Sequence, residues 1–216
     1  MSSPAVVLFA RSPEREAAAK RMRSGARLFR AVVAAWLRAA RHHGALPLIA
    51  CAAEDREALA AIAPEIERGW IEQHGDSFGT RVANAAEDAF ARGHDAVVLA
   101  AIDAPPHHLG PALAALSRGI PVLAPASDGG VNYVGITSVD RTLLENLTSQ
   151  HCRDHFADLL IVETITDLDS PHAIAFARRE RPWRAFLPPI LTIPAVPAII
   201  LRGTTNASRT RPPPLA

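Results

Sequence analysis

An uninterrupted apolar run that ends in a carboxylate most constrains how this chain can fold. Residues 96–102 are all apolar, and Asp103, Ala104 and Pro105 follow at once. A strand that is apolar on both faces is typical of a parallel sheet covered by helices on both sides. Ligands of such sheets bind outside the carboxyl ends of the strands. We therefore expect Asp103 to stand at the mouth of a binding crevice.

A second apolar run, residues 121–126, also leads into an acid. It is followed by Ser127, Asp128, Gly129 and Gly130, and a further strand pattern covers residues 131–136. Glycines allow backbone conformations and a close ligand approach that side chains would obstruct. We expect Asp128 to face the same cleft as Asp103.

Strand and helix patterns alternate along the rest of the chain. This alternation predicts an α/β fold with a mainly parallel sheet, and 216 residues suffice for one such domain. The last predicted helix has Ser170 as its N-cap and Pro171 as its first residue. The further predicted strands are residues 5–10, 46–52, 70–73 and 159–166, and the predicted helices are residues 26–42, 54–62, 77–92, 139–147 and 171–179.

A glycine-containing loop precedes the helix predicted at residues 77–92. Asp76 or Ser77 can cap this helix, Gly75 lies just before them, and Arg81 falls in the first turns. A helix N-terminus behind such a loop can hold an anion. The alternative is a capped helix whose arginine is merely solvated.

The overall charge excludes some classes of partner. Charged residues make up 21% of the chain and the net charge is +1, so no global field points to nucleic acid or to an anionic membrane. Basic residues between Arg11 and Arg41 form either a solvated helix face or a polyanion site. The N-terminus has no signal-peptide pattern and no segment reaches transmembrane length. We expect a cytoplasmic protein in which Cys51 and Cys152 are buried thiols.

The C-terminal part of the chain differs in composition from the rest. Residues 181–216 contain eight of the 18 prolines, which prevent a long helix or a central strand. We expect one domain over residues 1–180 and a Pro-rich tail over residues 181–216. In this tail, residues 186–201 would wrap the domain or meet a partner, and residues 203–216 would be disordered.

Five short motifs occur in order along the domain. They are Leu-Phe-Ala-Arg-Ser-Pro at residues 8–13, Gly-Asp-Ser-Phe-Gly-Thr-Arg at 75–81, Ile-Asp-Ala-Pro at 102–105, Pro-Ala-Ser-Asp-Gly-Gly at 125–130 and Asp-Leu-Asp-Ser-Pro at 167–171. Together they resemble the small bacterial GT-A-fold transferases called rSAM/selenodomain-associated transferase 1. That family is similar to the molybdenum-cofactor and phospholactate guanylyltransferases.

The resemblance covers about residues 5–180 and implies a GT-A-like, three-layer nucleotide-diphospho-sugar transferase fold. It also implies a nucleotide-sugar or nucleoside-triphosphate donor, a small-molecule acceptor, and Mg²⁺ or Mn²⁺ held by oxygen ligands. The implied site residues are Asp103 and Asp128 for catalysis, Asp103 and Asp169 for the metal, Arg11, Arg21, Gly75 and Arg81 for the phosphates, and Gly129 and Gly130 for the acceptor loop.

The chain also departs from the family pattern. Its first loop lacks the usual glycine, its lysine is missing or displaced by one position, and Glu14 and Glu16 bring carboxylates that would repel a diphosphate. Val131 and Asn132 replace an aromatic pair. Three functions therefore stay open: a metal-dependent nucleotide-sugar glycosyltransferase, a nucleotidyltransferase of the guanylyltransferase type, and a catalytically degenerate nucleotide- or partner-binding protein.

Some questions are not settled by the residues. A hydrolase built on a histidine-bound metal at His107 and His108, or at His42 and His43, is disfavoured, because adjacent side chains diverge and no third ligand has matching spacing. The sequence identifies neither the donor base nor the acceptor, and it leaves a homodimer open.

Overall fold

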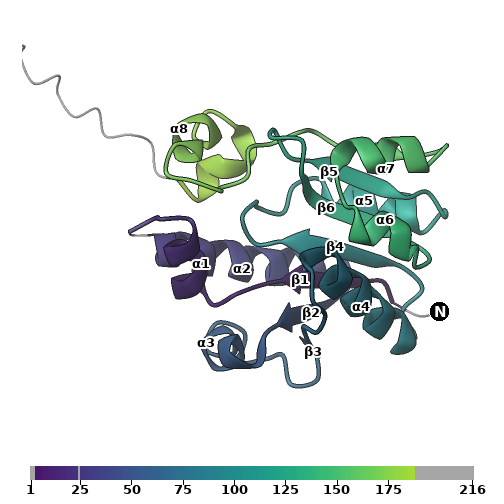
Figure 1. The fold of residues 1–216 in the computed structure, drawn as a ribbon, viewed down its shortest axis with the longest axis horizontal. Helices are drawn as coiled ribbons and strands as arrows, with labels where there is room; N and C mark the ends of the chain where they lie inside the picture. The colour runs from purple at the N-terminus through teal and green to yellow at the C-terminus, as the bar shows by residue number, and fades with distance from the viewer. Residues whose placement is uncertain (1–2, 24, 188–216) are drawn as a thin grey trace, which may run out of the picture.

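The computed structural model describes residues 3–23 and 25–187. They form a three-layer α/β structure around a seven-stranded sheet with the order β3-β2-β1-β4-β6-β5-β7 (Figure 1). The strands are β1 (Ala5–Phe9), β2 (Leu46–Cys51), β3 (Trp70–Glu72), β4 (Val97–Ala101), β5 (Val122–Pro125), β6 (Val131–Ile136) and β7 (Leu160–Ile161).

The sheet is mainly parallel, as predicted. β1 pairs in parallel with β2 and β4, β2 with β3, and β5 with β7, whereas β6 runs antiparallel to both of its neighbours. In the pairing of β4 with β6, Val97 lies opposite Ile136 and Ala100 opposite Tyr133. The end of β4 therefore meets the start of β6. Asp103 and Asp128 consequently lie at the same edge of the sheet.

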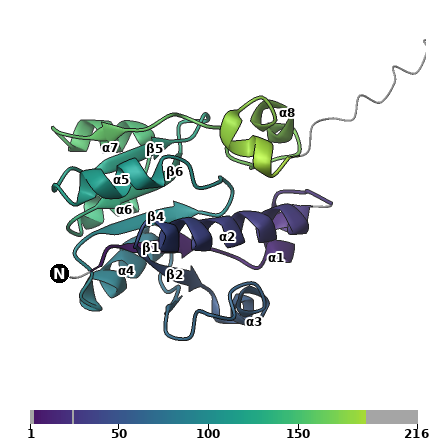
Figure 2. The same ribbon diagram turned by 180° about the vertical axis from the view of Figure 1, so that it is seen from behind.

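Helices cover both faces of the sheet (Figures 1 and 2). Alternate residues of each strand point to opposite faces, so in β1 Val6 packs in the core beneath α2 and α5, and Val7 in the core beneath α4, α6 and α7. The helices are α1 (Pro13–Ala19), α2 (Gly25–His42), α3 (Arg56–Ala60), α4 (Phe78–Ala91), α5 (Leu109–Leu116), α6 (Arg141–Glu145), α7 (Ser149–His155) and α8 (Ala173–Ala177), with 3₁₀ helices η1 (Ala53–Asp55) and η2 (Arg181–Ala185).

Several predicted elements need correction. The charged segment after β1 forms α1, and α5 and α7 were not predicted. The strand predicted at residues 159–166 is limited to β7 and a single bridge between Ala126 and Ile165. After this bridge, Thr166 donates its backbone N–H and its hydroxyl to the carboxylate of Glu180. The last helix starts at Ala173 with His172 as its N-cap, and Ser170 accepts only through its backbone carbonyl.

The beginning of the predicted tail packs on the domain. Trp183 of η2 is fully buried, and its Nε1–H donates to the carbonyl oxygen of Thr166 at 2.7 Å. Phe186 and Leu187 also contact the core, and the rest of the predicted wrapping segment and the predicted disordered end lie outside the described residues. Among the described residues, no helix has both the length and the apolar character needed to cross a membrane.

Candidate functional site

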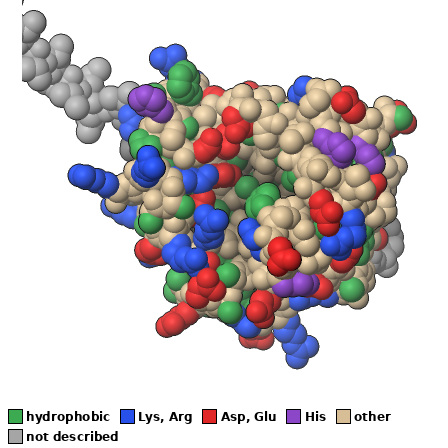
Figure 3. All heavy atoms as spheres, in the orientation of Figure 1, with side chains coloured by type: hydrophobic (Ala, Val, Ile, Leu, Met, Phe, Trp, Pro, Cys, Tyr) green, Lys and Arg blue, Asp and Glu red, His purple; other side chains and the backbone are tan. Residues whose placement is uncertain are grey.

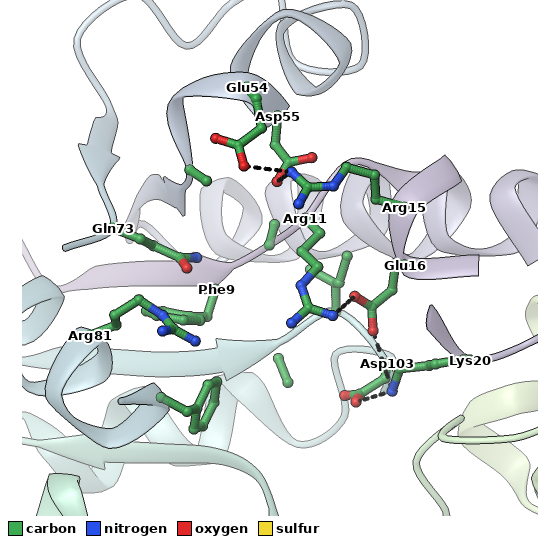
Figure 4. A pocket seen from close by; sticks show the side chains of 15 residues that line it. Phe9, Arg11, Arg15, Glu16, Lys20, Glu54, Asp55, Gln73, Arg81 and Asp103 are labelled. Atoms are coloured by element: carbon green, nitrogen blue, oxygen red, sulfur yellow. Dashed lines mark hydrogen bonds and ion pairs between the residues drawn. The ribbon is translucent and has the colours of Figure 1, made fainter. Parts of the chain in front are cut away.

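A cavity of about 530 Å³ lies over the carboxyl ends of β1 to β4 (Figure 4). It brings together three residues that the sequence singled out, Arg11 after β1, Arg81 in α4 and Asp103 after β4. These residues are 22 or more positions apart in the chain, and the parallel strands collect them at one edge of the sheet. The predicted crevice at the end of β4 is therefore present.

Lys20 is the cation closest to Asp103. Its Nζ lies 2.6 Å from Asp103 Oδ2 and 3.4 Å from Glu16 Oε1. Burial alone would lower the pKa of Lys20, but the charges of Asp103 and Glu16 outweigh it and raise the pKa above its ordinary value. The ammonium group is thus held charged between two carboxylates.

Arg21 points elsewhere than the sequence-based prediction placed it. It does not line this cavity but a second one, of about 850 Å³, between α2 and α8. Arg21 has a left-handed backbone with φ of 55°, so the chain turns sharply just after Lys20. Lys20 and not Arg21 therefore supplies the cation of the first loop.

A buried carboxylate fixes the loop between β1 and α1. Asp55 is 1% exposed, accepts the backbone N–H of Ser12 at 2.9 Å, and pairs with Arg15 Nη1 at 2.9 Å. Glu54 pairs with the same Arg15 at 3.0 Å but is exposed. No local pattern predicted this anchor, because Ser12 and Asp55 are 43 positions apart and belong to no common motif.

Two arginines remain available for a ligand. Arg11 is half exposed and lies 4.0 Å from Glu16, and Arg81 forms no ion pair within the described part of the chain. Ser77 caps α4 by accepting the backbone N–H of Thr80, which settles the choice between Asp76 and Ser77. The guanidinium groups of Arg11 and Arg81 can therefore donate hydrogen bonds to phosphate oxygens without breaking a strong internal pair.

Gly75 has a backbone conformation that favours glycine, and it does not line the cavity. Its φ is +129°, a conformation that side chains disfavour. A Cβ there would also lie 2.9 Å from Thr80 Cγ2 and 3.3 Å from the backbone nitrogen of Arg81. Gly75 thus lets the loop pack closely against the start of α4.

An aromatic pair borders the same cavity. Phe78 is 56% exposed, and its ring meets the ring of Phe9 edge to face with centroids 5.4 Å apart. The Gln73 side chain donates from Nε2 to the carbonyl oxygen of Ala50 at 2.8 Å. An exposed apolar ring at this position can contact a flat ligand group.

Three further carboxylates cluster beside β5. Asp128, Asp167 and Asp169 each offer an oxygen, and these oxygens lie within 4.8 Å of one another. The loop that holds two of them adjoins the end of β4, because the N–H of Leu168 donates to the carbonyl oxygen of Asp103 at 2.9 Å. Within the described ranges, none of the three clustered acids pairs with Lys, Arg or His.

Crowding of these acids changes the protonation of one of them. Burial is the main cause that raises the pKa of Asp167 to about 7, and the nearby charges of Asp103, Asp169 and Asp128 add to it. The sequence pointed only to Asp169. The missed signal is the spacing Asp-Leu-Asp, in which the buried Leu168 separates two acids that both point toward the cluster.

The turn after β5 shapes the acidic cluster. Gly129 has a φ of +94°, and the N–H of Gly130 donates to Asp128 Oδ1 at 2.8 Å. Asp128 lines a separate cavity of about 520 Å³ together with Asp167 and Asp169. Asp103 and Asp128 thus line neighbouring cavities at one sheet edge, where the sequence had suggested a single cleft.

The histidine pair has a structural role. Buried His107 places Nδ1 3.1 Å from the carbonyl oxygen of Pro105 and Nε2 3.1 Å from that of Glu163. Tyr133 donates its hydroxyl to the carbonyl oxygen of His107 at 2.8 Å. Burial lowers the pKa of His107, so its ring stays neutral and only one of its nitrogens can donate to these carbonyl oxygens. That bond and the Tyr133 bond fasten the loop after Asp103.

The donor set of the cluster suits a hard divalent cation. Asp128, Asp167 and Asp169 offer only carboxylate oxygens, the ligand type that Mg²⁺ and Mn²⁺ prefer, and Asp103 lies close enough for its charge to act on Asp167. A cation among them would offset the repulsion between the acids, which adds to burial in raising the pKa of Asp167. The residues present therefore fit the metal that the resemblance implies.

Solved structures show the same fold. A crystal structure of a candidate nucleotide-diphospho-sugar transferase from Desulfovibrio desulfuricans G20 superposes with a TM-score of 0.69 at 21% identity, covering 85% of this chain and 91% of that one. A candidate glucose-1-phosphate thymidylyltransferase from Bacillus anthracis gives 0.52 at 8% identity, with 82% and 94% covered. The 4-diphosphocytidyl-2C-methyl-D-erythritol synthase of Anaerococcus prevotii DSM 20548 gives 0.53 at 9%, with 82% and 97% covered.

These similarities confirm the expected GT-A-like fold, and at such low identity they show the fold alone. No curated protein sequence matches the chain. A family model does match, over residues 33–150, and its description is "Uncharacterized protein conserved in bacteria (DUF2064)". This match spans 118 of the 216 residues, and the protein therefore belongs to the DUF2064 family.

Proposed function

We propose that this protein is a metal-dependent transferase that uses a nucleotide-activated donor, and specifically a nucleotide-sugar glycosyltransferase. The closeness of two available arginines, Arg11 and Arg81, to an acidic cluster without cationic partners in the described chain carries this proposal. Four cationic and four acidic side chains line the cavity over β1 to β4, so its formal charge is zero. A neutral cavity does not by itself attract a diphosphate. A divalent cation at Asp128, Asp167 and Asp169 would reduce their formal charge from −3 to −1 and can bind diphosphate oxygens directly.

Asp167 and Asp169 would hold the cation together with Asp128 or, once Asp103 is released from Lys20, with Asp103. A bound Mg²⁺ or Mn²⁺ supplies charge stabilisation for the departing phosphate. Arg11 and Arg81 would bind phosphate oxygens. Their guanidinium groups remain charged at any physiological pH and can bind these oxygens in a bidentate way.

The acids beside β5 would orient and deprotonate the acceptor. In the proposed step, an acceptor hydroxyl attacks the anomeric carbon, the carbon–oxygen bond to the phosphate breaks, and the nucleoside diphosphate leaves with the bonding electrons. Asp128 orients the hydroxyl and takes its proton, as the sequence suggested.

Nucleotidyl transfer is the second candidate. It is favoured by the fold shared with a thymidylyltransferase candidate and a cytidylyl-transferring synthase. The two reactions use the same cavity but release different products, namely a nucleoside diphosphate in glycosyl transfer and pyrophosphate in nucleotidyl transfer. Product analysis by chromatography therefore distinguishes them.

The degenerate alternative is weakened by the position of Glu16. This carboxylate was expected to repel a diphosphate, but it lies 3.4 Å from Lys20 and is 11% exposed. Its charge is thus compensated inside the protein. The other glutamate of the first loop, Glu14, pairs with Arg30 at 2.6 Å and does not line the cavity.

Calorimetric titration tests the proposal. Nucleotides and nucleotide sugars are titrated into the protein with Mg²⁺, Mn²⁺ or EDTA, and one nucleotide class should bind only when the metal is present. Asp103→Asn should abolish this metal-dependent binding while circular dichroism stays unchanged. Asp158→Asn, at an exposed acid outside both cavities, is the matched control.

Two outcomes would contradict the assignment. Equal binding with metal and with EDTA would remove the role of the carboxylates. Absence of binding to a folded protein would favour the degenerate binding protein. The cytoplasmic location, the division at residue 180 and a homodimer stay predictions.

A further inference from the structure

The cavity between α2 and α8 has no part in the proposed transfer. It measures about 850 Å³, which is within the range of sites that bury a small organic ligand. It lies at the end of the molecule where α1 and α8 approach each other (Figures 1 and 2). Figure 3 shows Lys and Arg side chains gathered over this end.

The walls of this cavity combine two chemistries. Seven side chains contribute apolar surface, and the charged side chains are arginines without a single acid. The apolar group is Met22, Leu28, Ala31, Pro171, Ile174, Phe186 and Leu187, and the arginines are Arg21, Arg23, Arg27 and Arg178.

The four arginines lack counter-charges in the described part of the chain. None of them forms an ion pair or a side-chain hydrogen bond there, whereas Arg15, Arg30, Arg41 and Arg141 all do. The Nε atom of Arg178 is buried without a hydrogen-bond partner. A buried donor without an acceptor destabilises the fold, so an anion that accepts a hydrogen bond from this Nε–H would be stabilising.

The chain's own C-terminal segment does not match this requirement. Residues 188–216 contain no Asp or Glu, so their side chains cannot neutralise the arginines. A simple inorganic anion would satisfy the guanidinium groups but leave the apolar wall exposed to water. A ligand with both an anionic head and an apolar body satisfies both parts.

We propose that this cavity is a binding site for a monomeric amphiphile with one anionic, phosphate-type head and an apolar chain. The head lies among Arg21, Arg27 and Arg178, and the chain lies against Leu28, Ile174 and Phe186. The site borders the candidate active site at two points of the backbone, since Arg21 follows Lys20 and Pro171 follows the acidic loop that ends at Asp169. It requires neither metal nor nucleotide and is independent of the proposed transfer.

Calorimetric titration of the full chain tests this site. The probe is 1-oleoyl lysophosphatidic acid below its critical micelle concentration, and we expect saturable binding of one molecule per chain. Inorganic phosphate and neutral monoolein should each bind at least about tenfold more weakly, because each satisfies only one wall of the cavity. Equal binding of monoolein would overturn the role of the arginines.

Variants localise the binding. The double variant Arg27→Gln and Arg178→Gln should weaken binding by about tenfold or more, since each lost charged hydrogen bond costs affinity. Ala31→Trp, at an exposed position in the wall, should block the cavity without changing its charge. Arg38→Gln, on α2 but outside the cavity, should leave binding unchanged.

Three results would overturn the proposal. They are no binding to the folded wild type, unchanged binding in both cavity variants, and binding only to phosphatidylglycerol vesicles. The last result would assign the arginines to a membrane surface rather than to a monomeric ligand.

Discussion

Among the residues that the structure describes, carboxylates are paired with cations in one region of the candidate site and lack such partners in the neighbouring region. In the cavity over β1 to β4, Asp55 pairs with Arg15, and Glu16 and Asp103 both pair with Lys20. In the acidic cluster beside β5, the carboxylates have no cationic partner within the described residues. Paired carboxylates hold the fold in shape, whereas unpaired ones depend on protons or on a cation from outside.

The largest effect should come from removing the buried partner of a pair. Asp55→Ala should lower the free energy of unfolding by about 2 to 3 kcal/mol, because it leaves the N–H of Ser12 without its buried acceptor. Urea denaturation measures this change. Glu54→Ala removes the exposed partner of the same arginine and should unfold like the wild type. Similar losses in both variants would show that Asp55 does not anchor the loop.

The acidic cluster beside β5 should make the stability of the protein depend on pH. The pKa of Asp167 is about 7 in the folded chain against an ordinary value of 3.8, so the folded state holds the proton more tightly than the unfolded state. The contribution of Asp167 to the free energy of unfolding should therefore be largest below pH 4 and should fall as the pH rises toward 7. Asp167→Asn removes this fall and should stabilise the protein at pH 8 by about 1 to 2 kcal/mol, after allowance for solvent screening.

Thermal denaturation at pH 5 and pH 8 measures the difference between the two proteins. Mn²⁺ at pH 8 should stabilise the wild type and not the variant, because the cation replaces the proton that Asp167 loses. An Asp158→Asn variant should follow the wild-type pH profile. Parallel pH profiles for the wild type and Asp167→Asn would contradict the crowding of acids in this cluster.

Arg81 in the cavity over β1 to β4 should contribute to nucleotide binding and not to the stability of the fold. Arg81→Gln should weaken the metal-dependent binding of a nucleotide donor about tenfold, because one charged hydrogen bond to phosphate is lost. Its melting temperature should stay unchanged, since Arg81 has no ion pair within the described chain to lose. Arg153→Gln, at an exposed position on α7, is the control for a general charge effect. A loss of stability in Arg81→Gln would give this arginine a structural role.

The sequence predicted the features that depend on neighbours along the chain. The apolar run before Asp103 determined a buried strand, and the glycine loop before Ser77 determined the start of α4. The features that were missed depend on distant partners. Lys20 meets Asp103 across 83 positions, and no local pattern reports such a pair. The end of the strand predicted at residues 159–166 also has a partner outside any local pattern, since Thr166 donates to Glu180, 14 positions later.

The smallest expected effect concerns the aromatic edge of the neutral cavity. Phe78 is 56% exposed and meets only the edge of Phe9, so Phe78→Ala should cost about 0.5 kcal/mol of stability. If the exposed ring contacts the base of the donor, nucleotide affinity should fall about threefold, less than for a base stacked on a full aromatic platform. Metal-dependent binding of inorganic pyrophosphate has no base to lose and should not change. Equal losses for nucleotide and pyrophosphate would instead mean that Phe78 supports the phosphate-binding start of α4, and the base would then lie elsewhere in the cavity.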